Sequence, residues 1–345
     1  MKKKCIVLDL DNTLWGGVVG EEGYNNIVLS HSGQGASFVA FQQALLDLYH
    51  RGIILAINSS NNSNDAMEVI EKHPNMILKP HHFAAIRINW NDKVENMRSI
   101  AEELNIGLDS MVFLDDNPTN REAMRTFLPE VETPELPEDS SEYVHFMHPL
   151  PYFQSEAITD EDKMRGNLYV TERLRRESEK AFADKESFLK SLLLKMKVVK
   201  NDVESIDRLV QLTEKTNQFN TNKRPMTASK ISDYSKDPNY CVFSARVMDK
   251  FGDYGITAFT LVRKETDEWV IESLLLSCRV IGRGVEEALL SAIAGDGRDA
   301  GVSRLRVLFV PTDKNKPARD FVDRYFTEGV ARVESFPNPE WILIV

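Results

Sequence analysis

The sequence lacks an apolar run long enough to span a membrane, which would require about 20 consecutive residues. The longest runs, such as Leu192–Leu194 and Ile342–Val345, are only a few residues long. A signal peptide is not indicated either, because Asp9 and Asp11 interrupt the short apolar segment that follows the basic N-terminus. We therefore expect a cytoplasmic protein with no membrane partner.

Cysteine and positive charge are also scarce. The three cysteines, Cys5, Cys241 and Cys278, have neither metal-ligand spacing nor a paired framework, so free thiols are expected. The net charge of -11 argues against a large nucleic-acid interface, which needs a basic face. An acidic chain can still bind a phosphate group locally, through backbone amides and a metal ion.

The length of 345 residues favours two domains over one. In the first third, strand and helix patterns alternate, which predicts a parallel sheet with helices on both faces and a ligand site at the carboxyl ends of the strands. The predicted strands are Cys5–Leu8, Ile53–Ile57, Phe83–Ile88 and Ser110–Leu114, and the predicted helices are Phe38–His50, Asp65–Glu71, Lys93–Leu104 and Glu122–Phe127.

The proline-rich, acidic stretch 129–151 indicates a domain boundary, which we place between residues 150 and 151. A charged helical region is expected at Thr159–Lys195, as a linker into a mixed α+β second domain spanning residues 151–345. Strands are predicted there at Lys197–Val199, Cys241–Met248, Ile256–Val262, Trp269–Leu276, Leu305–Phe309 and Trp341–Val345, and helices at Gly284–Ala294 and Ala318–Phe326.

The segment Asp-Leu-Asp-Asn-Thr directly follows the first buried strand. Strand alternation would place Asp9 and Asp11 on one side, where two acids are costly to bury unless a cation such as Mg²⁺ neutralises them. A carboxylate in that position can also attack phosphorus. Taken alone, the segment could equally be a solvated loop. The features that favour a phosphoryl site are Ser59 after the second strand, Lys93 at the start of a helix, and Asp115 and Asp116 after the fourth strand.

This ordered set resembles the four motifs of the haloacid dehalogenase (HAD) superfamily. The resemblance implies a HAD-like Rossmannoid domain over residues 1–150, with Asp9 as the nucleophile and Asp11 as the general acid and base. The segments between Asp11, Ser59 and Lys93 are too short for a full cap domain, so the site is open or is covered by the second domain. The implied Mg²⁺ ligands are Asp9, Asp11 (through its backbone carbonyl), Asp115 and Asp116, and the implied phosphate-binding residues are Asn12, Ser59 and Lys93.

A second motif, Ser277–Glu286, follows a strand and opens a helix with the sequence Ser-Cys-Arg-Val-Ile-Gly-Arg-Gly-Val-Glu. Glycines in such a place let backbone amides approach a phosphate at a helix N-terminus, although a purely structural turn is the alternative. The motif resembles the acyl-CoA loop of GNAT acyltransferases. The resemblance implies that Arg279, Gly282, Arg283 and Gly284 bind the arm of coenzyme A or of a carrier protein.

Motifs along the whole chain resemble those of the FkbH-like family, in which a HAD domain is fused to a GNAT-like domain. Members remove phosphate from an acyl phosphate such as 1,3-bisphosphoglycerate and load a glyceryl group onto an acyl carrier protein, for polyketide-type biosynthesis. The resemblance implies this activity, with Mg²⁺ as cofactor, a phosphorylated small molecule as substrate and a carrier protein as partner. The segments that carry the resemblance are Asp9–Gly20, Phe113–Pro118, Thr216–Asn220, Phe251–Gly255 and Ser277–Glu286.

The chain departs from some members of that family, which have a cysteine between the two motif aspartates, where this sequence has Leu10. Cys278 is then the candidate for carrying the acyl group, because a helix N-terminus and Arg279 would both favour its thiolate. A buried, inert cysteine is the alternative.

Other functions stay open from the sequence. The chain could be a stand-alone phosphatase for small metabolites, with the second domain as a lid or binding module. A non-enzymatic scaffold is a third possibility, against which the intact set of motif residues argues. Because carrier proteins are usually acidic, docking one here would need a basic patch. The candidates for that patch are Arg173, Arg175 and Arg176, or Arg279 and Arg283.

Overall fold

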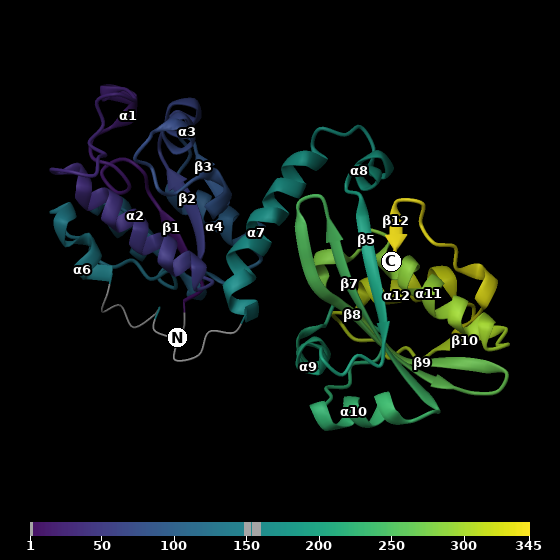
Figure 1. Cartoon of the computed structure of the whole chain (residues 1–345). Coiled ribbons are helices and arrows are strands. Elements are labelled where there is room, and N and C mark those ends of the chain that lie inside the picture. The colour runs from purple at the N-terminus through teal and green to yellow at the C-terminus, as the bar shows by residue number, and fades with distance from the viewer. Residues whose placement is uncertain (1–2, 148–152, 154–159) are drawn as a thin grey trace. The chain divides into compact units, whose positions relative to one another are not determined.

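The computed structural model describes residues 3–147, 153 and 160–345. The chain forms two compact units, Met1–Glu177 and Ser178–Val345, which we call the N-terminal and the C-terminal unit (Figure 1). Within the described part of the chain, no helix combines the length and the apolar character that crossing a membrane demands.

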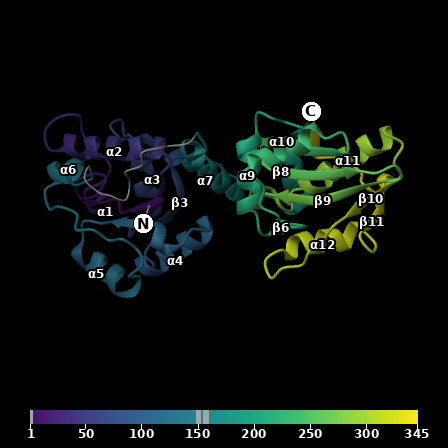
Figure 2. The ribbon, with the colours of Figure 1, turned by 90° about the horizontal axis from the view of Figure 1, so that it is seen from below.

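The N-terminal unit is built on a four-stranded sheet in the order β3-β2-β1-β4, with all neighbouring strands parallel. Every residue of β1, β2 and β4 is buried, because α2 and α6 lie on one side of the strands and α4 and α5 on the other (Figure 2). The strands are β1 (Cys5–Leu8), β2 (Ile54–Ser59), β3 (Phe83–Ile88) and β4 (Met111–Leu114), and the helices are α1 (Val19–Glu22), α2 (Gly35–His50), α3 (Ser63–Lys72), α4 (Lys93–Leu104), α5 (Pro118–Phe127) and α6 (Tyr143–Met147).

The predicted parallel sheet and its strand-helix order are confirmed, with small differences at the ends of elements. Helix α5 begins at Pro118 and not at Glu122, because the Asn117 side chain accepts the Thr119 amide and caps the helix, and proline is suited to the first turn. Between β1 and β2 the chain forms only α1 and α2, and between β2 and β3 mainly α3, so no cap domain is inserted there.

The charged region expected at Thr159–Lys195 is divided into α7 (Asp160–Glu179), α8 (Lys185–Ser191) and the start of β5. Asp184 caps α8, and Leu193 adopts a left-handed backbone conformation (φ 55°) that ends the helical segment before β5. The predicted boundary at residues 150 and 151 lies outside the described residues. The division between the compact units falls after Glu177, within α7.

The C-terminal unit contains an eight-stranded mixed sheet. Its strand order is β11-β10-β9-β8-β7-β5-β12, and β6 pairs with the end of β9. The strands are β5 (Leu194–Lys200), β6 (Phe219–Asn220), β7 (Tyr240–Asp249), β8 (Gly252–Lys264), β9 (Glu268–Leu276), β10 (Arg304–Val307), β11 (Val330–Arg332) and β12 (Ile342–Ile344), and the remaining helices are α9 (Ile206–Lys215), α10 (Ala228–Lys236), α11 (Val285–Asp299) and α12 (Lys316–Tyr325).

The strand-helix-strand unit of β9, α11 and β10 positions the glycine-rich motif. Strands β9 and β10 are parallel and pair from Glu268 to Ile271, so the chain crosses between them through α11. Helix α11 buries an apolar face that includes Leu289 and Ile293 against the sheet. The predicted mixed α+β second domain is therefore confirmed, although α9 and α10 were not predicted.

Candidate active site

Parallel pairing of β1 with β4 brings the first and the fourth motif together. Leu8 is paired with Leu114, and the Asp9 amide donates to the Leu114 carbonyl at 2.9 Å, so the residues after each strand end are adjacent. Asp9, Asp115 and Asp116 each offer a carboxylate oxygen, and these oxygens lie within 4.8 Å of one another. The structure thus places three predicted site residues in one cluster at the carboxyl edge of the sheet.

Lys93 supplies the positive charge of this cluster. It is the first residue of α4, whose N-cap Asp92 accepts the amides of Val94 and Glu95. The Lys93 Nζ lies 2.9 Å from Asp9 Oδ1 and 2.6 Å from Asp115 Oδ2. Because the lysine side chain is only 8% exposed, this is a buried ion-pair network in which one cation serves two carboxylates.

Burial sets the acidity of these groups. Burial raises the pKa of Asp9 to about 6, against the lowering effects of Lys93 and of a hydrogen bond from the Ser59 hydroxyl, while Asp115 raises it further. Burial alone would lower the pKa of Lys93, but the charges of Asp9 and Asp115 outweigh burial and raise it. Lys93 therefore stays protonated, and the cluster still has more carboxylates than cations.

The loop after β4 holds Asp115 in place. Its carboxylate accepts the Asn117 amide at 2.9 Å and the Asn120 side-chain amide at 3.1 Å. The Arg121 guanidinium donates to the carbonyls of Asp115 and Asp116 at 2.8 and 2.6 Å. These contacts fix the backbone of both acids, and Asn120 and Arg121 were not identified from the sequence.

Asp11 has a different environment from the cluster. Its carboxylate accepts hydrogen bonds from the Trp15 indole at 2.9 Å, the Val19 amide at 3.1 Å and the Asn61 side chain at 2.7 Å. These contacts hold the carboxylate in a fixed orientation, and burial raises its pKa. Its side chain is not part of the carboxylate cluster, so the metal contact proposed for Asp11 would have to come from its backbone. Asn61 was not singled out by the sequence pattern, beyond its place in the polar run after β2.

The side chains of Asn12 and Leu10 contact the rest of the N-terminal unit. Asn12 adopts a left-handed conformation (φ 55°), and its side-chain oxygen accepts the Gly17 amide at 2.8 Å, which stabilises the turn after the motif. That oxygen is therefore engaged within the loop. Leu10 is fully buried in the hydrophobic core, so the position at which some FkbH-like proteins have cysteine is not on the site surface here.

Ser59 is the last residue of β2 and is 1% exposed, beside Asp9. The Asn58 side chain donates to the Lys93 carbonyl at 2.8 Å and accepts from Asn96 at 3.2 Å, which ties α4 to β2. Ser59 and Lys93, the predicted phosphate-binding pair, both contact the same carboxylate, that of Asp9.

In the C-terminal unit, the predicted residues of the glycine-rich motif separate into two groups. Gly282 and Gly284 both have positive φ angles (73° and 87°) and line a cavity of about 620 Å³. Arg283 instead stacks over the Tyr254 ring at 5.4 Å, and the Arg279 side chain donates to Ser277 at 3.2 Å. Cys278 is exposed in a short 3-10 turn, Cys278–Val280, so the buried-cysteine alternative does not hold.

Two of the three arginines in the basic patch considered on α7, Arg173 and Arg175, are buried. The Arg173 guanidinium donates to the carbonyls of Phe83 and Pro80, and the Arg175 side chain is only 2% exposed. Arg176 pairs with Glu103 at 3.1 Å. Arg173 and Arg176 attach α7 to the N-terminal unit, because they donate to backbone carbonyls at and before the start of β3 and near the end of α4.

Comparisons with known proteins return structural neighbours only. No family model matches the chain, and no curated protein matches it. One solved structure, the N-terminal part of a Bacteroides fragilis protein containing a phosphatase domain and complexed with Mg, shares 47% identity over 45% of this chain and 42% of that chain, with a TM-score of 0.44. The chain therefore spans less than half the length of that neighbour.

Further neighbours are acetyltransferases. The ribosomal-protein-S18-alanine N-acetyltransferase of Escherichia coli is 12% identical over 40% of this chain and 94% of its own, with a TM-score of 0.31. The ribosomal-protein-alanine N-acetyltransferase of Brucella melitensis is 13% identical over 38% of this chain and 92% of its own, with a TM-score of 0.32.

Proposed function

We propose that this chain is a Mg²⁺-dependent phosphatase of HAD type whose C-terminal unit transfers an acyl group to a carrier protein, as in the FkbH-like family. The observation that carries the proposal is the position of Lys93 between Asp9 and Asp115, with Asp116 in the same cluster. Such a combination of buried acids and one cation is costly for stability, and it suits charge stabilisation of a phosphoryl group.

The donor set fits a magnesium ion. Mg²⁺ prefers hard oxygen ligands, and Asp9, Asp115 and Asp116 provide three carboxylates that a single lysine leaves incompletely neutralised. These three residues, with the backbone of Asp11, would hold the ion. When bound, the ion supplies charge neutralisation for the carboxylates and for the phosphoryl oxygens.

The residues of the chain then have distinct roles. An Asp9 oxygen attacks phosphorus, a P–O bond to Asp9 forms, and the bond to the substrate oxygen breaks. Asp11, held by Trp15 and Asn61, gives its proton to the leaving oxygen. Asp11 next takes a proton from the water that attacks the aspartyl-phosphate, and inorganic phosphate leaves. Ser59 and Lys93 bind the phosphoryl oxygens throughout.

The proposed substrate is a three-carbon acyl phosphate such as 1,3-bisphosphoglycerate, which carries a phosphate ester and an acyl phosphate. The Asp9 reaction hydrolyses the phosphate ester. The Cys278 sulfur attacks the acyl carbonyl, a thioester forms, and the acyl phosphate group leaves as inorganic phosphate. The carrier thiol then attacks this thioester and takes the glyceryl group, which returns the Cys278 thiol. The exposure of Cys278 supports the last two steps, since both need an accessible sulfur.

The test compares Asp9→Asn with Cys278→Ala. We expect Asp9→Asn to lower phosphate-ester hydrolysis by at least about a thousandfold, because an amide is a poor nucleophile, while circular dichroism shows an unchanged fold. Cys278→Ala should keep that hydrolysis and lose the glyceryl adduct that intact-mass spectrometry detects on a holo carrier protein. Near-normal hydrolysis by Asp9→Asn would remove Asp9 from the proposed role.

The stand-alone phosphatase remains the second candidate, because no cap domain is inserted between β1 and β3. The same experiment distinguishes the two functions. Asp9-dependent phosphate release with no adduct on either protein would support the phosphatase and contradict acyl transfer.

A further inference from the structure

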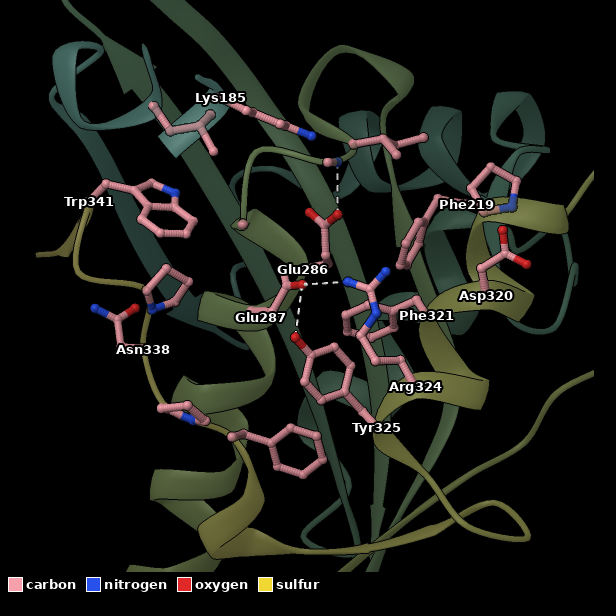
Figure 3. A pocket seen from close by; sticks show the side chains of 18 of the residues that line it. Lys185, Phe219, Glu286, Glu287, Asp320, Phe321, Arg324, Tyr325, Asn338 and Trp341 are labelled. Atoms are coloured by element: carbon pink, nitrogen blue, oxygen red, sulfur yellow. Dashed lines mark hydrogen bonds and ion pairs between the residues drawn. The ribbon is translucent and has the colours of Figure 1, made fainter. Parts of the chain in front are cut away.

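The cavity in the C-terminal unit lies at the N-terminus of α11 (Figure 3). Its volume of about 620 Å³ is in the range of small-molecule sites. Aromatic side chains form much of its wall, and two acids, Glu286 and Glu287, lie at its centre in Figure 3. The aromatic residues are Phe219, Phe321, Tyr325, Phe336 and Trp341.

Glu286 engages one of the loop amides that a phosphate could use, that of Gly282. Its Oε1 accepts the Gly282 amide at 2.8 Å, and its carboxylate also accepts its own backbone amide. The residue is 5% exposed, and its second oxygen, Oε2, has no hydrogen-bond partner among the described residues. A phosphate at a helix N-terminus needs free backbone N–H groups. Here the carboxylate of Glu286 takes the place of such a phosphate at the Gly282 amide.

A second acid strengthens the negative charge next to that loop. Glu287 accepts the Tyr325 hydroxyl at 3.1 Å, and the guanidinium of the exposed Arg324 is 3.9 Å away. Burial raises the pKa of Glu286 to about 7, and the charge of Glu287 makes the second-largest contribution. A pyrophosphate placed against these groups would add negative charge where it is already unfavourable.

We infer that Glu286 is a specificity-determining residue, an internal anion that makes this cavity accept the pantetheine arm of a carrier protein and reject coenzyme A. Coenzyme A carries a pyrophosphate and a further phosphate, whereas the arm of a carrier carries a single phosphodiester at its far end. The pantetheine part of the arm is uncharged, and its amides and methylene groups suit aromatic and prolyl walls. Exposed Lys185 lies beside Gly282, where it can meet a single phosphodiester. The inference rests on the proposed acyl transfer to a carrier.

The test is a ligand-observed NMR titration of the full chain with pantetheine and with coenzyme A at pH 8.5, above the pKa of Glu286, so that its carboxylate is ionised. EDTA is present so that the metal site does not contribute. We expect the wild type to bind coenzyme A no more tightly than pantetheine. Glu286→Gln keeps the size and the acceptor but removes the charge, so it should tighten coenzyme A binding at least about tenfold and change pantetheine binding by less than about twofold. Glu286→Ala, which frees the Gly282 amide, should show the same gain.

Glu287→Gln is the matched control, because it removes an adjacent charge and leaves the Gly282 amide engaged. It should tighten coenzyme A binding by less than about threefold. Tighter binding of coenzyme A than of pantetheine by the wild type overturns the inference, as does the absence of a gain in both Glu286 variants. Failure of the wild type to bind either ligand overturns it too, and Asp9-dependent phosphate release, measured separately, would then still support the phosphatase.

Discussion

At the scale of single residues, the phosphoryl site depends on one buried lysine between two aspartates. The substitution Lys93→Met removes the cation that Asp9 and Asp115 share, and it keeps an unbranched apolar side chain of similar length. Breaking a buried ion pair in this way costs about 3–5 kcal/mol, so we expect the N-terminal unit to lose stability by that order in EDTA. Thermal unfolding followed by circular dichroism measures the loss.

Magnesium separates this effect from ordinary destabilisation. A divalent cation at the three carboxylates takes over part of the charge compensation, so Mg²⁺ should raise the Tm of Lys93→Met more than that of the wild type. Lys72→Met is the control, because that lysine is 65% exposed and its ion pair with Glu68 contributes little. A Lys93→Met variant as stable as the control in EDTA would contradict the buried-network argument.

Glu286 gives the C-terminal unit a distinct dependence on pH. Its folded-state pKa of about 7 is raised above the ordinary value of 4.5. Above pH 4.5 the unfolded chain releases this proton and the folded chain retains it, so stability is lost as pH rises toward 7. The loss reaches up to about 3 kcal/mol. Glu286→Gln should remove this slope, so the variant should gain stability over the wild type from pH 4.5 to 7, as urea unfolding at several pH values would measure. Parallel curves for the two proteins would rule out a raised pKa.

At the scale of elements, the start of α4 decides where Lys93 lies. Asp92 caps this helix through the amides of Val94 and Glu95, and Lys93 is its first residue. Asp92→Ala should cost about 1 kcal/mol and loosen the lysine, so phosphate release should fall several-fold. Asp184→Ala removes the cap of α8 in the other unit and should leave phosphate release unchanged. Equal effects of the two variants would mean that capping acts only through general stability.

Elements with strong patterns were predictable from the sequence. Strand β3 and helix α4 have the predicted ends, because a continuous apolar run and a clear N-terminal signal define them. Helix α10 was missed, since it buries only Ile231 and so shows little periodicity, and β6 is a two-residue strand defined by its pairing with β9. The sequence did not reveal the break between α8 and β5, because it falls within a run of leucines. Leu193 is 65% exposed there, between two buried leucines.

The candidate site was predictable where parallel pairing alone determines it. Residues at the carboxyl ends of β1, β2 and β4 must meet at one edge, and Asp9, Ser59 and Asp115 do so. Residues in the loop after β1 were not predictable in this way, because the left-handed turn at Asn12 directs its side chain to Gly17. The internal anion at Glu286 also depends on a loop conformation that spacing does not reveal.

At the scale of the whole molecule, the two units have separate hydrophobic cores. One cluster of buried residues runs from Cys5 to Val170, and the clusters of the other unit begin at Phe188 and Leu209. Since cooperative unfolding follows a shared core, each unit should unfold as its own transition. Differential scanning calorimetry of the full chain should therefore show two transitions.

Magnesium identifies which transition belongs to which unit. A ligand that binds only the folded state of one unit stabilises that unit, by about 2.7 kcal/mol at a concentration a hundred times its Kd. Mg²⁺ should therefore raise only the transition of the N-terminal unit, which holds Asp9, Asp115 and Asp116. Asp115→Asn should abolish this shift, because it removes a ligand charge, whereas Glu286→Gln should keep it. A shift of both transitions in the wild type would show that the units unfold together, against the two separate cores.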